Sequence, residues 1–263
     1  MANEISLFNH FRPQEKILKS IFLSNGLSNM NYHIITDKQH YLLKCYRNRL
    51  PLEQLNAQNE LAKIGIAPKV YGFNPMTNAA LFDYIAGETA SHISISSIVV
   101  PLVQLHQFPS DSACLNLSTH FLLYQDLAEY KVFEQKINRV LALIEALPKN
   151  LGFCHNDLVM ANIINNTNGF IMIDFEYAQN NDIFFDLAAV SSSYQLNKKQ
   201  KLRLLKLYFE YSGLSMTKES AFKKLSLFSF IYNVLCYFWY IGEGYKEAAK
   251  LALSQLHNCN FNK

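Results

Sequence analysis

Three side chains that can handle protons or a metal ion lie close together in the second half of the chain. Asp157 follows His155 after one residue, and Asn162 comes after four more. The form His-x-Asp-x-x-x-x-Asn is typical of a kinase catalytic loop, in which the Asp accepts a hydroxyl proton and the Asn holds Mg²⁺. Asp174 leaves an apolar run, where a second metal-binding Asp is expected. This spacing predicts phosphoryl transfer from ATP, with Asp157, Asn162 and Asp174 as catalytic residues and Asn162 and Asp174 as Mg²⁺ ligands.

Lys44 is the candidate for binding the phosphates. It lies in the apolar, strand-like stretch Tyr41-Leu42-Leu43-Lys44. A lysine in such a stretch is costly to bury without a partner, because desolvation disfavours its charge. We expect Glu60 on the following helix to be that partner, with Glu53 as the alternative. In kinases the equivalent ion pair holds the lysine on the α- and β-phosphates.

The elements that must position these residues fall into two groups. The first group is small and rich in strands, whereas the second is mostly helical with short strands around the catalytic segment. We expect helices over 1–24 and 53–64, a hairpin of strands over 31–35 and 40–46, strands over 69–73 and 79–85, and helices over 93–108, 121–147, 183–212 and 217–256. This order predicts an α+β, two-lobed, protein-kinase-like fold. Residues 1–87 form the nucleotide-binding lobe, and residues 88–263 carry the catalytic loop and the substrate-binding helices.

Composition limits the possible partners and locations. Hydrophobic residues make up 50% of the chain and charged residues 17%, and the net charge is +3. Dispersed charge of this size predicts no nucleic-acid partner. The uncharged stretch 225–242 is long enough to span a bilayer, but its polar residues favour a buried helix, and we expect no membrane insertion. Five widely spaced cysteines and a charged N-terminus without a signal peptide predict a cytoplasmic protein.

Further motifs follow one another in a recognisable order. They are Asn25-Gly26-Leu27-Ser28-Asn29-Met30-Asn31-Tyr32, Lys44, Gly65-Ile66-Ala67-Pro68, His155-Asn156-Asp157, Asn162 and Ile173-Asp174-Phe175-Glu176-Tyr177-Ala178. Together they resemble the choline/ethanolamine kinase branch of the aminoglycoside phosphotransferase family, over residues from about 24 to 190. The resemblance implies that Ser28 and its turn cover the phosphates, and that the backbone around Asp83 and Tyr84 meets the adenine. It also implies that Asp186 supports the catalytic loop, which His155 braces.

The same resemblance indicates the acceptor, a small-molecule alcohol. Glu176 and Tyr177 match an acidic and an aromatic residue that help to surround a quaternary ammonium group, which aromatic faces attract by up to about 2 kcal/mol. Tyr232 and Trp239, on an aromatic-rich C-terminal helix, are further candidates for substrate binding. Choline is therefore the first expectation for the acceptor. The chain departs from the choline kinases in one respect, since they present paired tryptophans on this helix and this chain has one tryptophan in total.

Other acceptors and one non-enzymatic role stay open. Thiamine, another cationic alcohol, suits the same chemistry. An aminoglycoside site would gather carboxylates, yet from Leu187 onward four acidic residues stand against eleven lysines and arginines. A kinase-shaped binding protein is the non-enzymatic alternative, although the intact set of Lys44, Asp157, Asn162 and Asp174 favours an enzyme. The sequence does not distinguish ATP from GTP and leaves the oligomeric state and the pathway open.

Overall fold

The computed structural model describes residues 3–24, 29–167 and 169–257. The chain divides into two compact units: unit 1 consists of Met1–Thr89 and Ile163–Glu176, and unit 2 of Ala90–Asn162 and Tyr177–Lys263. Unit 1 is rich in strands and unit 2 in helices, which confirms the predicted α+β order. The predicted boundary after residue 87 lies close to Thr89, but the return of 163–176 to the first unit is a feature that the sequence analysis did not include.

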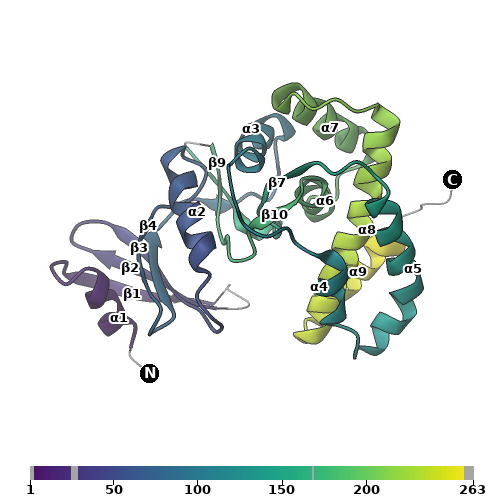
Figure 1. The fold of residues 1–263 in the computed structure, drawn as a ribbon. Coiled ribbons are helices and arrows are strands. Elements are labelled where there is room, and N and C mark those ends of the chain that lie inside the picture. The colour runs from purple at the N-terminus through teal and green to yellow at the C-terminus, as the bar shows by residue number, and fades with distance from the viewer. Residues whose placement is uncertain (1–2, 25–28, 168, 258–263) are drawn as a thin grey trace. The chain divides into compact units, whose positions relative to one another are not determined.

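Unit 1 is built on an antiparallel sheet with the strand order β1-β2-β3-β5-β4 (Figure 1). The strands are β1 (Ile17–Leu23), β2 (Met30–Thr36), β3 (His40–Cys45), β4 (Val70–Asn74) and β5 (Ala79–Asp83). Helix α1 (Glu4–Phe11) packs Phe8 into a cluster that includes Leu43, and α2 (Leu52–Lys63) packs Leu55 against Ala80. Successive side chains of a strand point to opposite faces. Lys44, opposite Ala80 in the register, therefore lies on the α2 side of the sheet.

One prediction for unit 1 is wrong in part, and most of the others are confirmed. The expected helix over 1–24 is a short helix α1 followed by the edge strand β1. The helix ends at Phe11 because Pro13 disfavours the helical conformation of the residue before it. The hairpin β2–β3, helix α2 and strands β4 and β5 lie close to their predicted positions.

A second, three-stranded sheet completes unit 1. It consists of β6 (Glu88–Thr89), β8 (Ile163–Asn166) and β9 (Gly169–Met172), in the order β6-β8-β9. The N–H of Met172 donates to the carbonyl oxygen of Ile66 at 2.9 Å, which ties β9 to the segment after α2. A single residue separates the end of β9 from Asp174.

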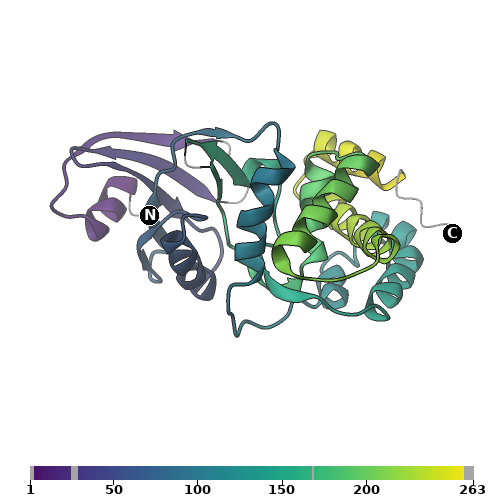
Figure 2. The same cartoon turned by 90° about the horizontal axis from the view of Figure 1, so that it is seen from above.

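Unit 2 is mostly helical. Its helices are α3 (Ile95–His106), α4 (Leu117–Leu122), α5 (Ala128–Glu145), α6 (Phe184–Ser193), α7 (Lys198–Ser212), α8 (Lys218–Gly242) and α9 (Lys246–His257). In both views α8 runs beside α5 and α9 (Figures 1 and 2). Strands β7 (Leu151–Cys154) and β10 (Gln179–Asp182) pair antiparallel and flank the catalytic segment. Gly152 is required where β7 meets α3, since an added Cβ would lie 2.5 Å from the His106 carbonyl oxygen.

Two predictions for the helices of unit 2 have different outcomes. The predicted single helix over 121–147 is wrong, because α4 ends at Leu122 and α5 begins at Ala128. No proline or glycine marks this break; instead Phe121 and Tyr124 both pack against Phe238 of α8. The predicted buried helix over 225–242 is confirmed. Helix α8 has the length and composition of a membrane span, and 67% of its most apolar window is buried within the protein.

Candidate active site

Lys44 is the centre of a charged group in unit 1 that we call the lysine cluster: Lys44, Asp174, Glu176 and Asn29. The lysine is 4% exposed, and its Nζ lies 2.5 Å from Asp174 Oδ1 and 3.1 Å from Glu176 Oε2. Asn29 Nδ2 donates to Glu176 Oε2 at 2.6 Å. The structure thus joins Lys44 to the carboxylate predicted to hold a metal and to the one predicted to meet the substrate.

The surroundings of Lys44 keep it positively charged. Burial alone lowers its pKa, but Asp174, with further contributions from Tyr46 and Glu176, outweighs that effect and raises the pKa above its ordinary value. The ring of Tyr46 lies 4.7 Å from Nζ, and burial raises the pKa of this phenol, which therefore stays neutral at ordinary pH. A buried ammonium group that stays charged and already contacts anionic groups is suited to bind a phosphate group.

Glu60 does not pair with Lys44 in this structure, so the predicted ion pair is wrong here. Its carboxylate lies 2.6 Å from Lys63 Nζ, one helical turn away, and its side chain is 52% exposed. Glu53 is exposed as well. The pairing of Lys44 with Asp174 and Glu176 has no local signal in the sequence, because these residues lie far from Lys44 in the chain and reach it only when β9 joins unit 1.

Asp174 has an unusual backbone conformation. Its φ is 67°, in the left-handed region that Asp tolerates better than most residues other than glycine. Its side chain is 34% exposed, more than that of Glu176 at 14%. The turn directly after β9 therefore leaves a carboxylate that contacts Lys44 and is still partly open to solvent.

The loop after β7 in unit 2 brings the predicted base and the predicted metal-binding Asn together. Asn162 Nδ2 donates to Asp157 Oδ2 at 2.8 Å and to the Asp157 carbonyl oxygen at 2.9 Å. Since the amide nitrogen faces Asp157, the carbonyl oxygen of Asn162 is the atom that suits a cation. Carboxylate and amide oxygens are the ligands that Mg²⁺ takes in proteins. The donor types of Asn162 and Asp174 therefore fit the implied metal.

Asp186 holds the start of this loop, which confirms its predicted supporting role. It is fully buried and accepts hydrogen bonds from the N–H of His155 at 2.7 Å and of Asn156 at 2.8 Å. His106 Nε2 lies 3.2 Å from Asp186 Oδ2, and His106 Nδ1 lies 2.7 Å from the Tyr208 hydroxyl. His106, Cys154 and Asp186 offer three possible metal ligands within 4.8 Å. Burial raises the pKa of the Cys154 thiol, however, and the bonds of Asp186 identify the group as a structural brace.

One face of α8 borders the predicted base. Tyr232, Cys236 and Tyr240 repeat every four residues. Burial raises the pKa of Cys236 and of Tyr240 to about 12 and raises the pKa of Tyr232 well above its ordinary value. The Asp157 charge contributes to the increase in all three groups. The Tyr232 hydroxyl has no hydrogen-bond partner among the nitrogen and oxygen atoms of the described residues, and after burial the largest contribution to its raised pKa comes from Cys236. Cys236 and Tyr240 were not singled out from the sequence, although their spacing from Tyr232 was visible there.

The other predicted acceptor residues occupy different settings. Trp239 stacks on Tyr245 with ring centroids 5.8 Å apart and meets the edge of Tyr240 at 5.3 Å. Tyr177 is 45% exposed, while Glu176 is held in the lysine cluster. Aromatic rings such as these suit a cationic ligand, but the carboxylate of Glu176 already has a cationic partner.

The predicted nucleotide-binding residues are only partly described. Ser28 and its turn lie outside the described residues. The N–H of Asp83 donates to the Lys69 carbonyl oxygen at 2.9 Å, and that of Tyr84 to the His40 carbonyl oxygen at 3.4 Å. The Tyr84 ring stacks on His33 with centroids 3.6 Å apart. Because these two N–H groups are used within unit 1, an adenine ring would have to meet other backbone groups of the segment.

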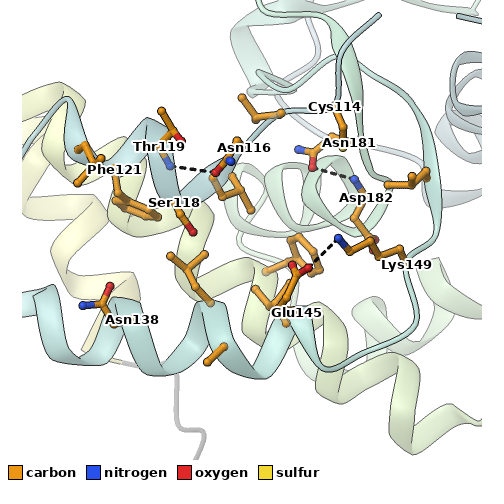
Figure 3. A pocket seen from close by; sticks show the side chains of 18 of the residues that line it. Cys114, Asn116, Ser118, Thr119, Phe121, Asn138, Glu145, Lys149, Asn181 and Asp182 are labelled. Carbon is orange, nitrogen blue, oxygen red and sulfur yellow. Dashed lines mark hydrogen bonds and ion pairs between the residues drawn. The ribbon is translucent and has the colours of Figure 1, made fainter. Parts of the chain in front are cut away.

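Unit 2 also contains a hollow of about 770 Å³ between α4, α5 and β10 (Figure 3). Its rim carries the ion pair of Lys149 with Glu145, at 2.8 Å. Asn181 and Asp182 of β10 line it, with the N–H of Asp182 donating to Asn181 Oδ1 at 2.8 Å. The predicted base and the predicted substrate residues are not among the lining residues.

Comparison with known proteins identifies relatives of this chain. Residues 20–216 match the phosphotransferase enzyme family. Protein LicA of Haemophilus influenzae is 34% identical over 88 residues, which cover 33% of each protein. Thiamine kinase of Escherichia coli is 29% identical over 144 residues, which cover 53% of this chain and 52% of the kinase. The matched stretch thus spans about half or less of the length of these relatives.

Solved structures share the fold. The choline kinase LicA from Streptococcus pneumoniae superposes with a TM-score of 0.79 and 17% identity, covering 97% of this chain and 99% of that one. A structure of LicA in complex with AMP gives a TM-score of 0.77 and 18% identity, covering 98% and 100%. These similarities confirm the predicted fold.

Proposed function

Because the chain belongs to the phosphotransferase enzyme family, we propose that it transfers the γ-phosphate of ATP to the hydroxyl group of a small cationic alcohol, with choline as the first candidate. The observation that carries this proposal is the pairing of Asp157 with Asn162 on a loop that the buried Asp186 holds by two backbone hydrogen bonds. A carboxylate fixed in this way is suited to accept a proton from an alcohol.

The proposed reaction assigns a role to each group. Asp157 accepts the proton of the alcohol as its oxygen attacks the γ-phosphorus, and the bond to the bridging oxygen breaks to release ADP. Lys44 binds the phosphates, for which it must exchange a carboxylate partner. When bound by Asn162 and Asp174, Mg²⁺ offsets negative charge on the phosphates. The LicA structure in complex with AMP supports the use of an adenine nucleotide.

The aromatic groups and the relatives support the proposed acceptor. The face of α8 next to Asp157 and the stack of Trp239 on Tyr245 support a ligand with one cationic group. The similarity to LicA supports choline. The longer match with thiamine kinase makes thiamine the second candidate. The few acidic residues after Leu187 weigh against an aminoglycoside.

The proposed location is the cytoplasm. Among the described residues Cys45, Cys114, Cys154 and Cys236 are all free thiols. Free thiols are stable in a reducing compartment. Both ATP and the proposed acceptors would be available there.

A substrate panel tests the proposal. Magnesium-dependent ADP release is measured with choline, ethanolamine, thiamine and kanamycin, using the wild-type protein and Asp157→Asn, which keeps the size of the side chain. We expect turnover with choline, and a loss of two or more orders of magnitude in kcat in the variant. Highest turnover with thiamine would select the second candidate. ATP binding without turnover of any alcohol would instead support a kinase-shaped binding protein.

A further inference from the structure

Asn156, the residue before the predicted base, is held in an uncommon conformation by many contacts. Its φ is 64°, in the left-handed region. Its N–H donates to Asp186 Oδ1 at 2.8 Å, and its Nδ2 lies 3.0 Å from the carbonyl oxygen of Tyr177 and 3.2 Å from that of Gln179. Asparagine tolerates this backbone region better than most residues. The side chain therefore connects the catalytic loop to the segment that begins at Tyr177.

Asn181 on β10 contacts the oxygen of the same amide group. Its Nδ2 donates to Asn156 Oδ1 at 2.8 Å. Its own Oδ1 accepts from the N–H of Asp182 at 2.8 Å (Figure 3). Asn181 is 3% exposed. Both ends of its amide group are therefore committed, so the donor cannot turn away from Asn156 without leaving a buried polar group unsatisfied.

The two asparagines, which we call the amide pair, link two segments of unit 2. One segment carries Asp157, and the other runs from the exposed Tyr177 through β10. A base works only within hydrogen-bond reach of the proton that it accepts. Movement of the loop relative to Tyr177 would therefore misalign the base and an alcohol held beside that tyrosine.

We propose that Asn156 and Asn181 are positioning residues that hold Asp157 in register with the acceptor-binding segment at Tyr177. The inference rests on the proposed function, since it assumes that Asp157 is the base and that Tyr177 contacts the acceptor. Neither asparagine touches the reacting atoms; both act through the loop. The amide pair keeps the proton acceptor and the alcohol aligned, whereas nucleotide binding depends on other residues.

Two substitutions separate the hydrogen bonds from the backbone conformation. Asn156→Gly keeps the left-handed backbone without strain but removes the side-chain contacts. Asn181→Asp replaces the donor by an oxygen of the same size, which repels Asn156 Oδ1. Asn138→Asp is the matched control, because it makes the same Asn-to-Asp change at an exposed residue that lines the hollow.

The first readout is steady-state kinetics with the best alcohol of the panel. We expect Asn156→Gly and Asn181→Asp to lower kcat about tenfold or more and to raise KM for the alcohol, while their KM for ATP stays at the wild-type value. The control Asn138→Asp should keep the kinetic constants and the melting temperature of the wild type. The fold-loss in kcat of the double variant should be smaller than the product of the two single fold-losses, because both substitutions break the same hydrogen bond between Asn181 and Asn156. Unchanged kcat in a folded Asn181→Asp protein would overturn the proposal, as would equal changes in both KM values.

Hydrogen exchange of residues 155–162 gives a second readout that needs no turnover. We expect faster exchange there in Asn181→Asp than in Asn138→Asp, with wild-type rates in β3. Wild-type exchange in this loop would show that the amide pair does not hold it. If the wild-type protein phosphorylates no alcohol, the proposed function fails, and the exchange result still decides whether the pair fixes the loop.

Discussion

Each unit contains a lysine that is almost completely buried, and the two have different partners. Lys44 in unit 1 is 4% exposed and binds two carboxylates, of which Asp174 is partly open to solvent. Lys224 on α8 in unit 2 is 1% exposed. Its Nζ donates to Asp182 Oδ2 at 2.6 Å, to the Pro148 carbonyl oxygen at 2.7 Å and to Asn150 Oδ1 at 2.8 Å.

The partners decide what each lysine does. Burial lowers the pKa of Lys224, and the single carboxylate of Asp182 opposes that effect without overcoming it. At Lys44 two carboxylates overcome it and raise the pKa. The partners of Lys224 belong to the connection from α5 to β7 and to β10, so they hold the fold. The partners of Lys44 are the residues predicted to bind a metal and a substrate. The same buried ammonium group therefore holds connecting segments together in unit 2, whereas in unit 1 it contacts the carboxylates predicted to take part in the chemistry.

The largest effect is expected from Lys44→Met, which removes the charge but keeps the length of the side chain. If Lys44 binds the phosphates, kcat/KM should fall by about 10²-fold or more, as for the loss of other electrostatic contacts to reacting groups. The measurement is ADP release with the best alcohol, together with a melting curve. Lys63→Met is the control, since Lys63 is exposed. Activity near that of the control would remove Lys44 from the reaction.

Lys224→Met should affect stability rather than chemistry. Removing one partner of a buried ion pair leaves an uncompensated charge, here on Asp182, at a cost of about 3–5 kcal/mol. For a chain of this size the melting temperature should fall by roughly 10 °C. The kcat of the folded fraction should stay near that of the wild type.

The double variant Lys224→Met/Asp182→Asn is the control for this loss. It removes both charges and should regain part of the lost stability, since no buried charge is left uncompensated and the amide oxygen can still accept from the Phe184 N–H, which now donates to Asp182 Oδ1. A single variant as stable as the wild type would contradict the structural role of Lys224.

The two lysines should also respond in opposite ways to alkaline pH. The folded-state pKa of Lys44 lies above 10.5, so its contribution to stability is complete below pH 10.5 and is lost as the pH rises through the folded value. The folded-state pKa of Lys224 lies below 10.5, so the unfolded chain binds more protons between those values and stability rises with pH there. The unfolding free energy of the wild type minus that of Lys44→Met should stay constant below pH 10.5 and fall above it. The corresponding difference for Lys224→Met should rise as the pH approaches 10.5 from below. A fall for Lys224→Met below pH 10.5, or a rise for Lys44→Met above it, would refute the contrast.

Local patterns predicted the fold well where local forces decide it. The hairpin β2–β3, the helix α2 and the buried helix α8 follow from the spacing of apolar residues. Strand β1 was mistaken for a helix because it is apolar on both faces: Leu18 and Phe22 are 60% and 57% exposed at the edge of the sheet. The break between α4 and α5 depends on packing against Phe238, which no local signal reveals.

The candidate site shows the same limit at the level of single contacts. The spacing of Asp157 and Asn162 indicates a shared loop, and the structure adds their hydrogen bond at 2.8 Å. The partner of Lys44 was misassigned because helix α2 is its neighbour in the chain, whereas Asp174 lies 130 residues away. Asn181 was missed for a similar reason, since its contact with Asn156 forms only when β10 pairs with β7.

The smallest effect is expected from Glu60→Ala, which tests whether the lysine cluster persists during turnover. Among the described residues Glu60 forms an ion pair with Lys63, an exposed lysine of its own helix, and such surface pairs contribute about 0–1 kcal/mol. Stability and kcat/KM should both stay near wild-type values if Lys44 exchanges a carboxylate for the phosphates without taking Glu60 as a new partner. A loss of about tenfold in kcat/KM without a change in melting temperature would show that Lys44 exchanges a carboxylate for Glu60 when ATP binds, a free-energy difference of about 1.4 kcal/mol. The lysine cluster would then be a resting arrangement, and the partner predicted from the sequence would be the one used in catalysis.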